Sequence, residues 1–258
     1  MCSKKSATVS SEARSVAHLY YLPTGETLVE GSSARLVGDE ARHAAVVSRL
    51  GVGEDILVGD GQGTLGRTTA TMVSPQEVVV DVHSTTFHPR PTTEMWLVQA
   101  LAKGDRDELA LQTCTELGVD RIIPWQAGRS VSQWRGDKVA KGVARWNKIA
   151  TEASKQALRA WIPPVDTVVS TKDLAKLGGT HELLLLDPDA QEPLSSYSPP
   201  TGKPVVVIVG PEGGVDPAER DVLIEAGATA WKLGSTVLRT SSAGPAAIAL
   251  LNSSLGRW

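Results

Sequence analysis

The chain has 258 residues, of which 41% are hydrophobic and 21% are charged, and these ordinary fractions exclude a largely disordered chain. A formal net charge of −3 excludes a protein that coats nucleic acid indiscriminately, although it can conceal a local basic patch. No apolar run approaches the ~18 residues of a membrane-spanning helix, and Cys2 and Cys114 give neither a disulfide framework nor a zinc cluster. We therefore expect a cytoplasmic protein that binds neither a membrane nor a metal ion.

The first third of the chain predicts a small β-domain. Residues 1–17 lack the apolar region of a signal peptide and are predicted to form a flexible tail. Residues 18–90 contain short β-rich runs separated by turns with glycine or proline. One helical stretch, residues 40–50, interrupts them and is predicted to place Ala44, Val47 and Leu50 on one face. The Pro-containing segment 88–93 is the predicted boundary to a second domain, residues 91–258.

The second domain alternates predicted strands and helices, which is typical of a mostly parallel sheet covered by helices. Strands are predicted over residues 94–102, 121–126, 181–187, 204–210 and 229–234. Helices are predicted over residues 105–118, 138–159, 216–227 and 241–255. The fold class is therefore α/β, with a separate β-rich front domain.

A glycine-rich loop follows the unbroken apolar run Val205–Val209. Glycines at the carboxyl end of a buried strand let the backbone approach a ligand, so Gly210–Gly214 is a candidate ligand loop; the alternative is a tight turn that merely requires glycine. The loop has neither the Lys-Ser or Lys-Thr of a P-loop nor the spacing of a dinucleotide-binding loop. After it, Asp216 is predicted to cap a helix, with Pro217 first in the helix and Glu219 at capping-box spacing.

A second candidate loop, Leu238–Thr240, precedes an alanine-rich helix that Ser241 or Ser242 is predicted to cap. The small residues of this helix, including Gly244, would let it approach a neighbouring backbone or subunit closely. A plain packing helix is the alternative for the helix itself.

Positive charge is concentrated between Arg121 and Arg159, where nine Lys or Arg residues face two acids, which leaves a charge of −10 elsewhere. In the helix that begins at Lys138, six cations fall at spacings of three, four or seven: Lys138, Lys141, Arg145, Lys148, Lys155 and Arg159. Apolar residues occupy another face, so the helix should pack on the sheet and present the cations outward. Such a stripe can be an ordinary solvated face, or, with Trp125, Trp134 and Trp161 nearby, a surface for RNA phosphates and bases. The predicted RNA-binding residues are Arg129, Arg135, Lys138, Lys141, Arg145 and Lys148.

Three separated segments, residues 100–131, 210–214 and 233–240, together resemble the SPOUT-class methyltransferases that modify uracil N3 in 16S ribosomal RNA. The likeness covers nearly the whole chain, and residues 43–63 look like that family's PUA-like RNA-binding barrel. The resemblance implies S-adenosylmethionine as cofactor, S-adenosylhomocysteine as product, a C-terminal trefoil knot, and a homodimer that acts on 16S ribosomal RNA or the small subunit.

The resemblance also implies which residues bind the methyl donor and which act on the RNA. The implied cofactor residues are Leu185, Leu186, Val209, Gly210, Pro211, Glu212, Gly213, Gly214, Leu233, Gly234, Val237, Leu238, Arg239 and Thr240. We expect Arg239 to stabilise charge on the uracil oxygens, and Arg159 and Gln156 to help hold the target nucleotide. Glu212 is the nearest carboxylate in these motifs, and it can be either a proton acceptor or a structural part of its loop.

The chain departs from the family pattern at Thr113, at residues 155–159, and at Ser241 and Ser242. The family has a carboxylate after the residue that matches Thr240, so its loss here puts that group's role as a proton acceptor in doubt. The departures leave two alternatives open: a noncatalytic RNA-binding or ribosome-assembly factor, or a SPOUT methyltransferase that acts on another RNA position such as a 2′-hydroxyl.

Overall fold

The computed structural model describes residues 18–200 and 202–258, so the predicted tail 1–17 lies outside the described residues. The chain divides into two compact units. The first comprises the chain up to Gly59 together with Gly66–Thr85, and the second comprises Asp60–Leu65 and Thr86–Trp258. Residues 60–65 belong to the second unit because the turn packs on it: a Cβ on Gly63 would lie 2.7 Å from the Trp161 ring.

The first unit is a five-stranded sheet in the order β1-β3-β4-β5-β2. Its strands are β1 (Leu19–Tyr21), β2 (Ser33–Val37), β3 (Asp55–Gly59), β4 (Thr64–Val73) and β5 (Glu77–Phe87). Alternate residues of the strands are buried, as in β5, where Val78, Val80 and Val82 enter the core and the residues between them do not.

The helical stretch of the first unit differs from the predicted regular helix. It consists of α1 (Gly38–Arg42) and a π-helical turn, η1 (His43–Val47), in which Ser48 N donates to His43 O. A π-turn spaces its hydrogen bonds five residues apart instead of four, which rotates the following residues around the axis. Ala44 and Leu50 are buried, but Val47 is 68% exposed, so the prediction that the three residues share one face was wrong.

The second unit is a five-stranded sheet in the order β10-β8-β9-β6-β7, and all four pairs of neighbouring strands are parallel. The strands are β6 (Met95–Ala100), β7 (Arg121–Trp125), β8 (Glu182–Leu186), β9 (Val205–Val209) and β10 (Thr229–Trp231). The predicted parallel α/β architecture is thus confirmed. All five residues of β9 are buried because helices cover both faces of the sheet.

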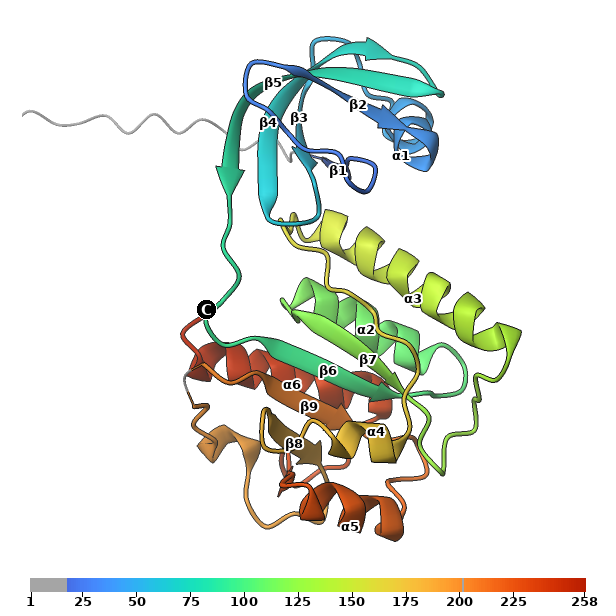
Figure 1. Ribbon diagram of the computed structural model, residues 1–258, viewed down its shortest axis with the longest axis vertical. Coiled ribbons are helices and arrows are strands. Elements are labelled where there is room, and N and C mark those ends of the chain that lie inside the picture. Colours follow the sequence, from blue (N-terminus) through green and yellow to red (C-terminus); the bar gives the residue numbers. More distant parts are fainter. Residues whose placement is uncertain (1–17, 201) are drawn as a thin grey trace, which may run out of the picture. The chain divides into compact units, whose positions relative to one another are not determined.

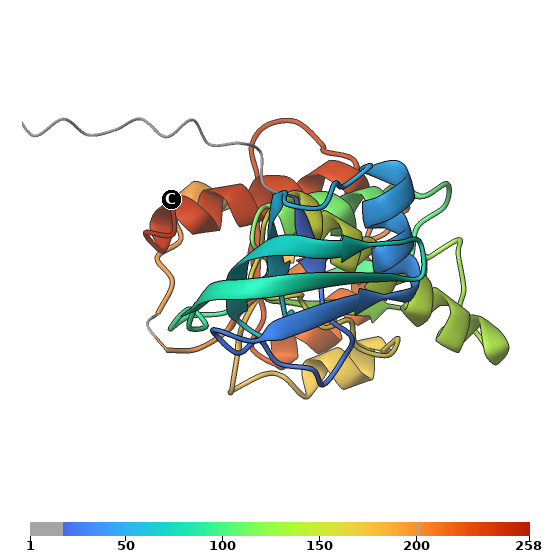
Figure 2. The same ribbon diagram turned by 90° about the horizontal axis from the view of Figure 1, so that it is seen from above.

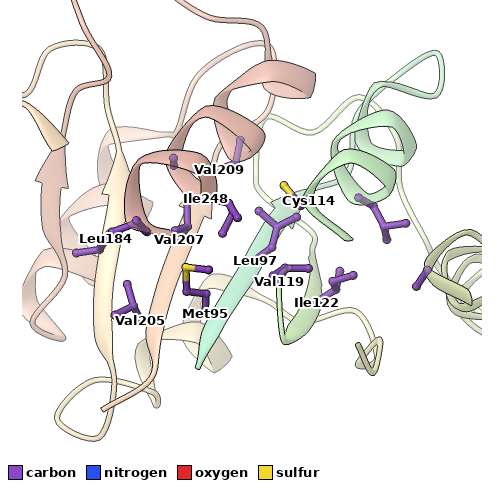
Figure 3. Packing of buried hydrophobic residues seen from close by; sticks show 14 of the residues in the cluster. Met95, Leu97, Cys114, Val119, Ile122, Leu184, Val205, Val207, Val209 and Ile248 are labelled. Carbon is purple, nitrogen blue, oxygen red and sulfur yellow. The ribbon is translucent and has the colours of Figure 1, made fainter. Parts of the chain in front are cut away.

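Two apolar cores lie on the two faces of this sheet, because successive side chains of a strand point to opposite faces. On one face, Met95 and Leu97 of β6 pack with α2 (Arg106–Glu116), α3 (Asp137–Gln156) and α6 (Thr240–Ser254) (Figure 3). On the other, Val98 packs with α4 (Thr171–Ala175) and α5 (Pro217–Glu225). Figure 2 shows the helices of the second unit from above.

Helix α3 ends earlier than predicted, at Gln156, and a 3₁₀ turn, η2 (Leu194–Ser196), and α4 were not predicted. The prediction that Lys155 belongs to the exposed stripe was wrong: its side chain is 7% exposed and pairs with Glu152 at 2.9 Å. Ala153, Ser154 and Lys155 point in different directions around the helix and are all buried, so the last turn of α3 is covered on more than one side.

Candidate functional site

Strands β8, β9 and β10 end beside one cavity of about 960 Å³, which we call the three-loop pocket. Figure 1 shows β8 and β9 as neighbouring strands of the sheet. The carboxyl ends of parallel strands meet at one edge of a sheet, where open α/β sheets usually bind ligands. Every residue that the sequence analysis assigned to a cofactor lines this pocket, from the loops 185–189, 209–215 and 231–240. The structure thus brings together three loops that are far apart in the sequence.

The loop after β9 has a shape that only small residues allow. A Cβ on Gly210 would lie 2.7 Å from Val215 Cγ2, and Gly214 adopts a φ of +73°, in the left-handed region. Asp216 caps α5 by accepting from Ala218 N at 3.0 Å, with Pro217 at the start of the helix, as predicted. Backbone groups of this loop can therefore approach a ligand closely.

The predicted capping box at Glu219 was wrong. Its carboxylate accepts from Gly128 N at 2.9 Å and from the Thr171 hydroxyl at 2.5 Å. The carboxylate thus binds the loop after β7 and the first residue of α4 instead of the start of its own helix. Glu219 therefore ties α5 to the loop after β7 and to α4.

Glu212 is held by two groups from the loop after β6. Its Oε1 accepts from Lys103 N at 3.1 Å and from Arg106 Nη1 at 3.2 Å. On the other side, Arg129 donates to Gly213 O at 3.2 Å. The loops after β6 and β7 thus clamp the glycine-rich loop, and the geometry supports the structural alternative for the Glu212 carboxylate.

The start of α6 is tied to the same loop by a buried chain of hydrogen bonds. Gln99 Nε2 donates to Thr240 Oγ1 at 2.8 Å, and Thr240 Oγ1 donates to Gly210 O at 2.9 Å. Gln99 and Thr240 are 0% and 6% exposed, respectively. The predicted cap of α6 by Ser241 or Ser242 was wrong: Arg239 is the N-cap residue and its side chain makes no cap hydrogen bond.

Charged groups surround the mouth of the three-loop pocket. Arg239 is exposed, and within the described ranges its side chain makes no hydrogen bond or ion pair with another residue. Asp187 and Arg220 form an ion pair at 2.9 Å, and this hydrogen bond raises the pKa of Arg220. Sequence reasoning missed Arg106, Asp187 and Arg220 as pocket residues. The position of Asp187 directly after a predicted buried strand could have identified it as a residue of a ligand site at the strand ends.

The predicted RNA-binding residues do not form one uniform surface. Arg129 lines the three-loop pocket. Lys138, Lys141 and Lys148 are exposed along α3 and form no ion pair with another residue of the described part of the chain. Arg145 instead pairs with Glu108, at 2.5 Å from Nε to Oε1. This pairing raises the pKa of Arg145 and offsets part of its charge. Arg135 is exposed just before α3.

Gln156 and Arg159 do not line the three-loop pocket of their own chain. Gln156 is exposed at the last position of α3. Arg159 donates to Thr115 O at 2.7 Å and to Val119 O at 2.8 Å, carbonyl groups at and just beyond the end of α2. Within one chain, Arg159 therefore stabilises a helix end.

The tryptophans of the basic segment have different environments. Trp125 is fully buried and donates to Thr171 at 3.1 Å, so it is a core residue. Trp161 donates to His88 O at 2.7 Å and has the Arg90 guanidinium 4.1 Å above its ring. Trp134 is half-buried beside a separate cavity.

The described residues contain neither a metal-binding cluster nor a membrane-spanning helix. Within residues 18–200 and 202–258, no group of three or more His, Cys, Asp and Glu side chains could hold a metal ion. None of the helices in these ranges is long and apolar enough to cross a membrane.

Comparisons with known proteins identify relatives over nearly the whole length. Residues 88–252 match the family model for the RNA methyltransferase domain. The chain is 37% identical over 249 residues to ribosomal RNA small subunit methyltransferase E of Mycobacterium bovis, covering 94% of each chain. It is 30% identical over 229 residues to the protein of that name from Bacillus subtilis, covering 85% of this chain and 90% of the relative.

A solved structure is also similar over most of its length. It is ribosomal RNA small subunit methyltransferase E from Neisseria gonorrhoeae bound to S-adenosyl methionine. The TM-score is 0.83 with 29% sequence identity, and the match covers 92% of this chain and 97% of that one.

Proposed function

Because this chain belongs to the RNA methyltransferase family, we propose that it transfers a methyl group from S-adenosylmethionine to N3 of a uridine in 16S ribosomal RNA. The observation that carries the proposal is the three-loop pocket, which gathers every residue assigned to the methyl donor from the sequence. The relatives from Mycobacterium bovis and Bacillus subtilis are named for small-subunit ribosomal RNA methylation.

The residues of the three-loop pocket fit S-adenosylmethionine. The cofactor supplies an electrophilic methyl group on a positively charged sulfur. Gly210 and Gly213 line the pocket without side chains, and the tight loop requires glycine at position 210, where a Cβ would lie 2.7 Å from Val215 Cγ2. Apolar Leu185 and Val209 form part of the wall, and Asp187 supplies a carboxylate at the mouth. Backbone groups and a few charges can therefore hold the donor without a metal ion.

The chemistry requires an unprotonated uracil N3, because the neutral imide is a poor nucleophile. Arg239 lines the pocket, and its guanidinium forms no ion pair with another described residue. A positioned cation stabilises negative charge that develops on the uracil oxygens. Arg239 is therefore the proposed charge-stabilising residue. Glu212 instead holds the glycine-rich loop through Lys103 and Arg106, and positioning of the two reactants supplies the remaining rate gain.

Contacts to RNA are proposed to come from two surfaces. Lys138, Lys141 and Lys148 would contact phosphates along α3. The first unit would act as a PUA-like RNA-binding barrel, consistent with its five-stranded sheet. A target base stacked inside RNA has to be unstacked to reach the donor.

The finer features implied by the resemblance are also part of the proposal: a trefoil knot, a homodimer and a cytoplasmic location. Support for the knot comes from the segment after β10, where Lys232 exchanges backbone hydrogen bonds with Glu192 and Leu194 of the β8–β9 connection. Since Gln156 and Arg159 do not line the pocket of their own chain, holding the target nucleotide would require a second copy of the chain.

The proposal is tested by titrating the protein with S-adenosylmethionine in a calorimeter and by measuring transfer of a labelled methyl group to small ribosomal subunits. We expect both binding and transfer. Binding without transfer would overturn the substrate assignment. Absence of both, in a protein that still binds RNA, would favour a noncatalytic RNA-binding factor.

A further inference from the structure

A second cavity, of about 330 Å³, opens between the loop after β6 and the loop after β7. We call it the Trp134 pocket. Its volume is at the lower end of the ~300–1,000 Å³ of typical small-ligand sites. It is lined by Ala102, Lys103, Gly104, Asp105, Asp107, Glu108, Val131, Ser132, Trp134 and Trp146. The methyl-transfer chemistry described above uses none of its side chains.

The Trp134 pocket lies next to the three-loop pocket because both cavities are built on the same two loops. In the loop after β6, Asp105 lines the Trp134 pocket and Arg106 lines the three-loop pocket. In the loop after β7, Arg129 lines the three-loop pocket and Val131 lines the Trp134 pocket. Residues two apart in a chain are separated by about 7 Å at most. Neighbouring nucleotides of one RNA strand can therefore reach both cavities.

One wall of the Trp134 pocket is a fixed aromatic ring. The rings of Trp134 and Trp146 pack edge to face, with centroids 5.2 Å apart. The Trp134 ring lies so close to α3 at Gly142 that any side chain at that position would collide with it. The ring is half-buried and is held from two sides. An aromatic face of this kind is a platform on which a nucleobase can stack.

The polar wall of the pocket carries hydrogen-bond acceptors. Asp107 is 6% exposed and accepts from Ala102 N at 3.0 Å and from Glu108 N at 2.9 Å. Both carboxylate oxygens of Asp107 therefore already accept a backbone N–H, and burial raises the pKa of this group. Asp105, whose side chain is 80% exposed, is the accessible carboxylate of this wall. It forms an ion pair with Arg145 at 3.6 Å, and Arg145 also pairs with Glu108.

Acceptors at this wall select among the bases. Cytosine, adenine and guanine each carry an amino group that donates to a carboxylate, whereas uracil has no amino group and offers only an imide N3–H that lies between two carbonyl oxygens. A carbonyl oxygen facing Asp105 or Asp107 would be repelled. The combination of a stacking ring with carboxylates is thus selective against a second uracil.

We propose that the Trp134 pocket binds an amino-bearing nucleobase of a nucleotide that flanks the target uridine. The inference rests on the proposed function, which puts RNA at the neighbouring three-loop pocket. The base stacks on Trp134 and its amino group donates to Asp105. The pocket then fixes the register of the strand, so that the target uridine enters the three-loop pocket.

The first test needs no methyl transfer. Protein labelled with 5-fluorotryptophan is saturated with S-adenosylhomocysteine and titrated separately with AMP, CMP, GMP and UMP, while fluorine resonances are recorded. The Trp134 resonance is assigned with Trp134→Phe. We expect at least one of the amino-bearing nucleotides to shift this resonance, UMP to shift it less at the same concentration, and Asp105→Asn to weaken the shift at least threefold. Asn also tolerates the left-handed φ of +57° at position 105. An equal shift with UMP, an undiminished shift in Asp105→Asn, or no shift with any nucleotide would overturn the proposal.

The second test separates this inference from the proposed function. With small subunits as substrate, Asp105→Asn is expected to raise KM for the subunit several-fold, with a smaller change in kcat and no change in affinity for S-adenosylmethionine. Asp137→Asn removes an exposed carboxylate outside both pockets and should match the wild type. Failure of the wild type to methylate small subunits would overturn the proposed function. The nucleotide titration would still test whether the Trp134 pocket binds an amino-bearing base. Wild-type kinetics in Asp105→Asn would overturn the pocket proposal alone.

Discussion

Thr240, the first residue of α6, donates its hydroxyl hydrogen to the carbonyl oxygen of Gly210 at a distance of 2.9 Å. The two residues come from different strand-end loops, and Thr240 is only 6% exposed. Buried hydrogen bonds of this type fix the relative position of the segments they join. The Thr240–Gly210 bond therefore sets the width of the three-loop pocket between α6 and the glycine-rich loop.

Replacing Thr240 with valine should weaken binding of S-adenosylmethionine. Valine has a similar shape but leaves Gly210 O without its donor and Gln99 Nε2 without one acceptor. Losing a buried bond of this kind costs about 1–3 kcal/mol. We expect an increase of roughly tenfold in the dissociation constant measured by calorimetry. Thr240→Ser keeps the hydroxyl and should remain close to the wild type; equal losses in both variants would contradict this role.

Replacing Arg239 with alanine should reduce turnover far more than donor binding. Its guanidinium is proposed to stabilise charge on the uracil, and removal of one such group costs on the order of 10²–10³ in kcat. Single-turnover methylation of small subunits measures the rate, and calorimetry measures the donor affinity. Arg239→Lys, which keeps the charge but loses the planar fork, should be intermediate. Unchanged turnover in Arg239→Ala would remove Arg239 from the mechanism.

Glu212 allows a comparison between a catalytic and a structural carboxylate. Gln in its place retains an oxygen that can accept from Lys103 N and Arg106, whereas Ala retains none. We therefore expect Glu212→Gln to keep most of the activity with an unchanged pH profile of kcat, and Glu212→Ala to bind S-adenosylmethionine more weakly. A large loss of kcat in Glu212→Gln would instead identify Glu212 as a proton acceptor.

The cations of α3 should differ in how they affect RNA binding. Lys138, Lys141 and Lys148 are exposed, and replacing all three with glutamate should weaken RNA binding and flatten its salt dependence. Each lost phosphate contact reduces the slope of log K against log salt by about 0.7–0.9. Because Arg145 pairs with Glu108, Arg145→Glu should lower the free energy of unfolding and change the slope less. Filter binding at several salt concentrations measures the slope, and urea denaturation measures the free energy of unfolding. A larger change of slope in Arg145→Glu than in the triple variant would contradict this prediction.

Patterns that depend on local spacing and buried runs predicted most of the second unit. The run Val205–Val209 had to be a buried strand, because it is apolar without alternation and ends at glycine. Asp216 and Pro217 marked the start of α5 through short-range chemistry. The methyl-donor residues came from the family resemblance, and the pocket gathers all of them.

The errors came from partners that are distant in the sequence. Glu219 has the spacing of a capping box, yet its carboxylate binds Gly128, a residue that no local pattern connects to it. Val47 lies outside the core because the helix changes to a π-turn. Lys155 and Arg159 carry the same charge as Lys148, but Lys155 is buried and Arg159 binds a carbonyl group at the end of α2. Periodicity gives the face of a residue in an ideal helix, whereas tertiary packing decides which groups it meets.

The most direct test of the account is the position of the transferred methyl group. Small ribosomal subunits that lack this modification are incubated with the protein and labelled S-adenosylmethionine, and their RNA is digested to nucleosides and analysed by mass spectrometry. We predict label in N3-methyluridine with the wild type. With Arg239→Ala at the same protein concentration and a short reaction time, we predict no label. Label in a 2′-O-methylated nucleoside, or no label from protein that binds S-adenosylmethionine, would contradict it.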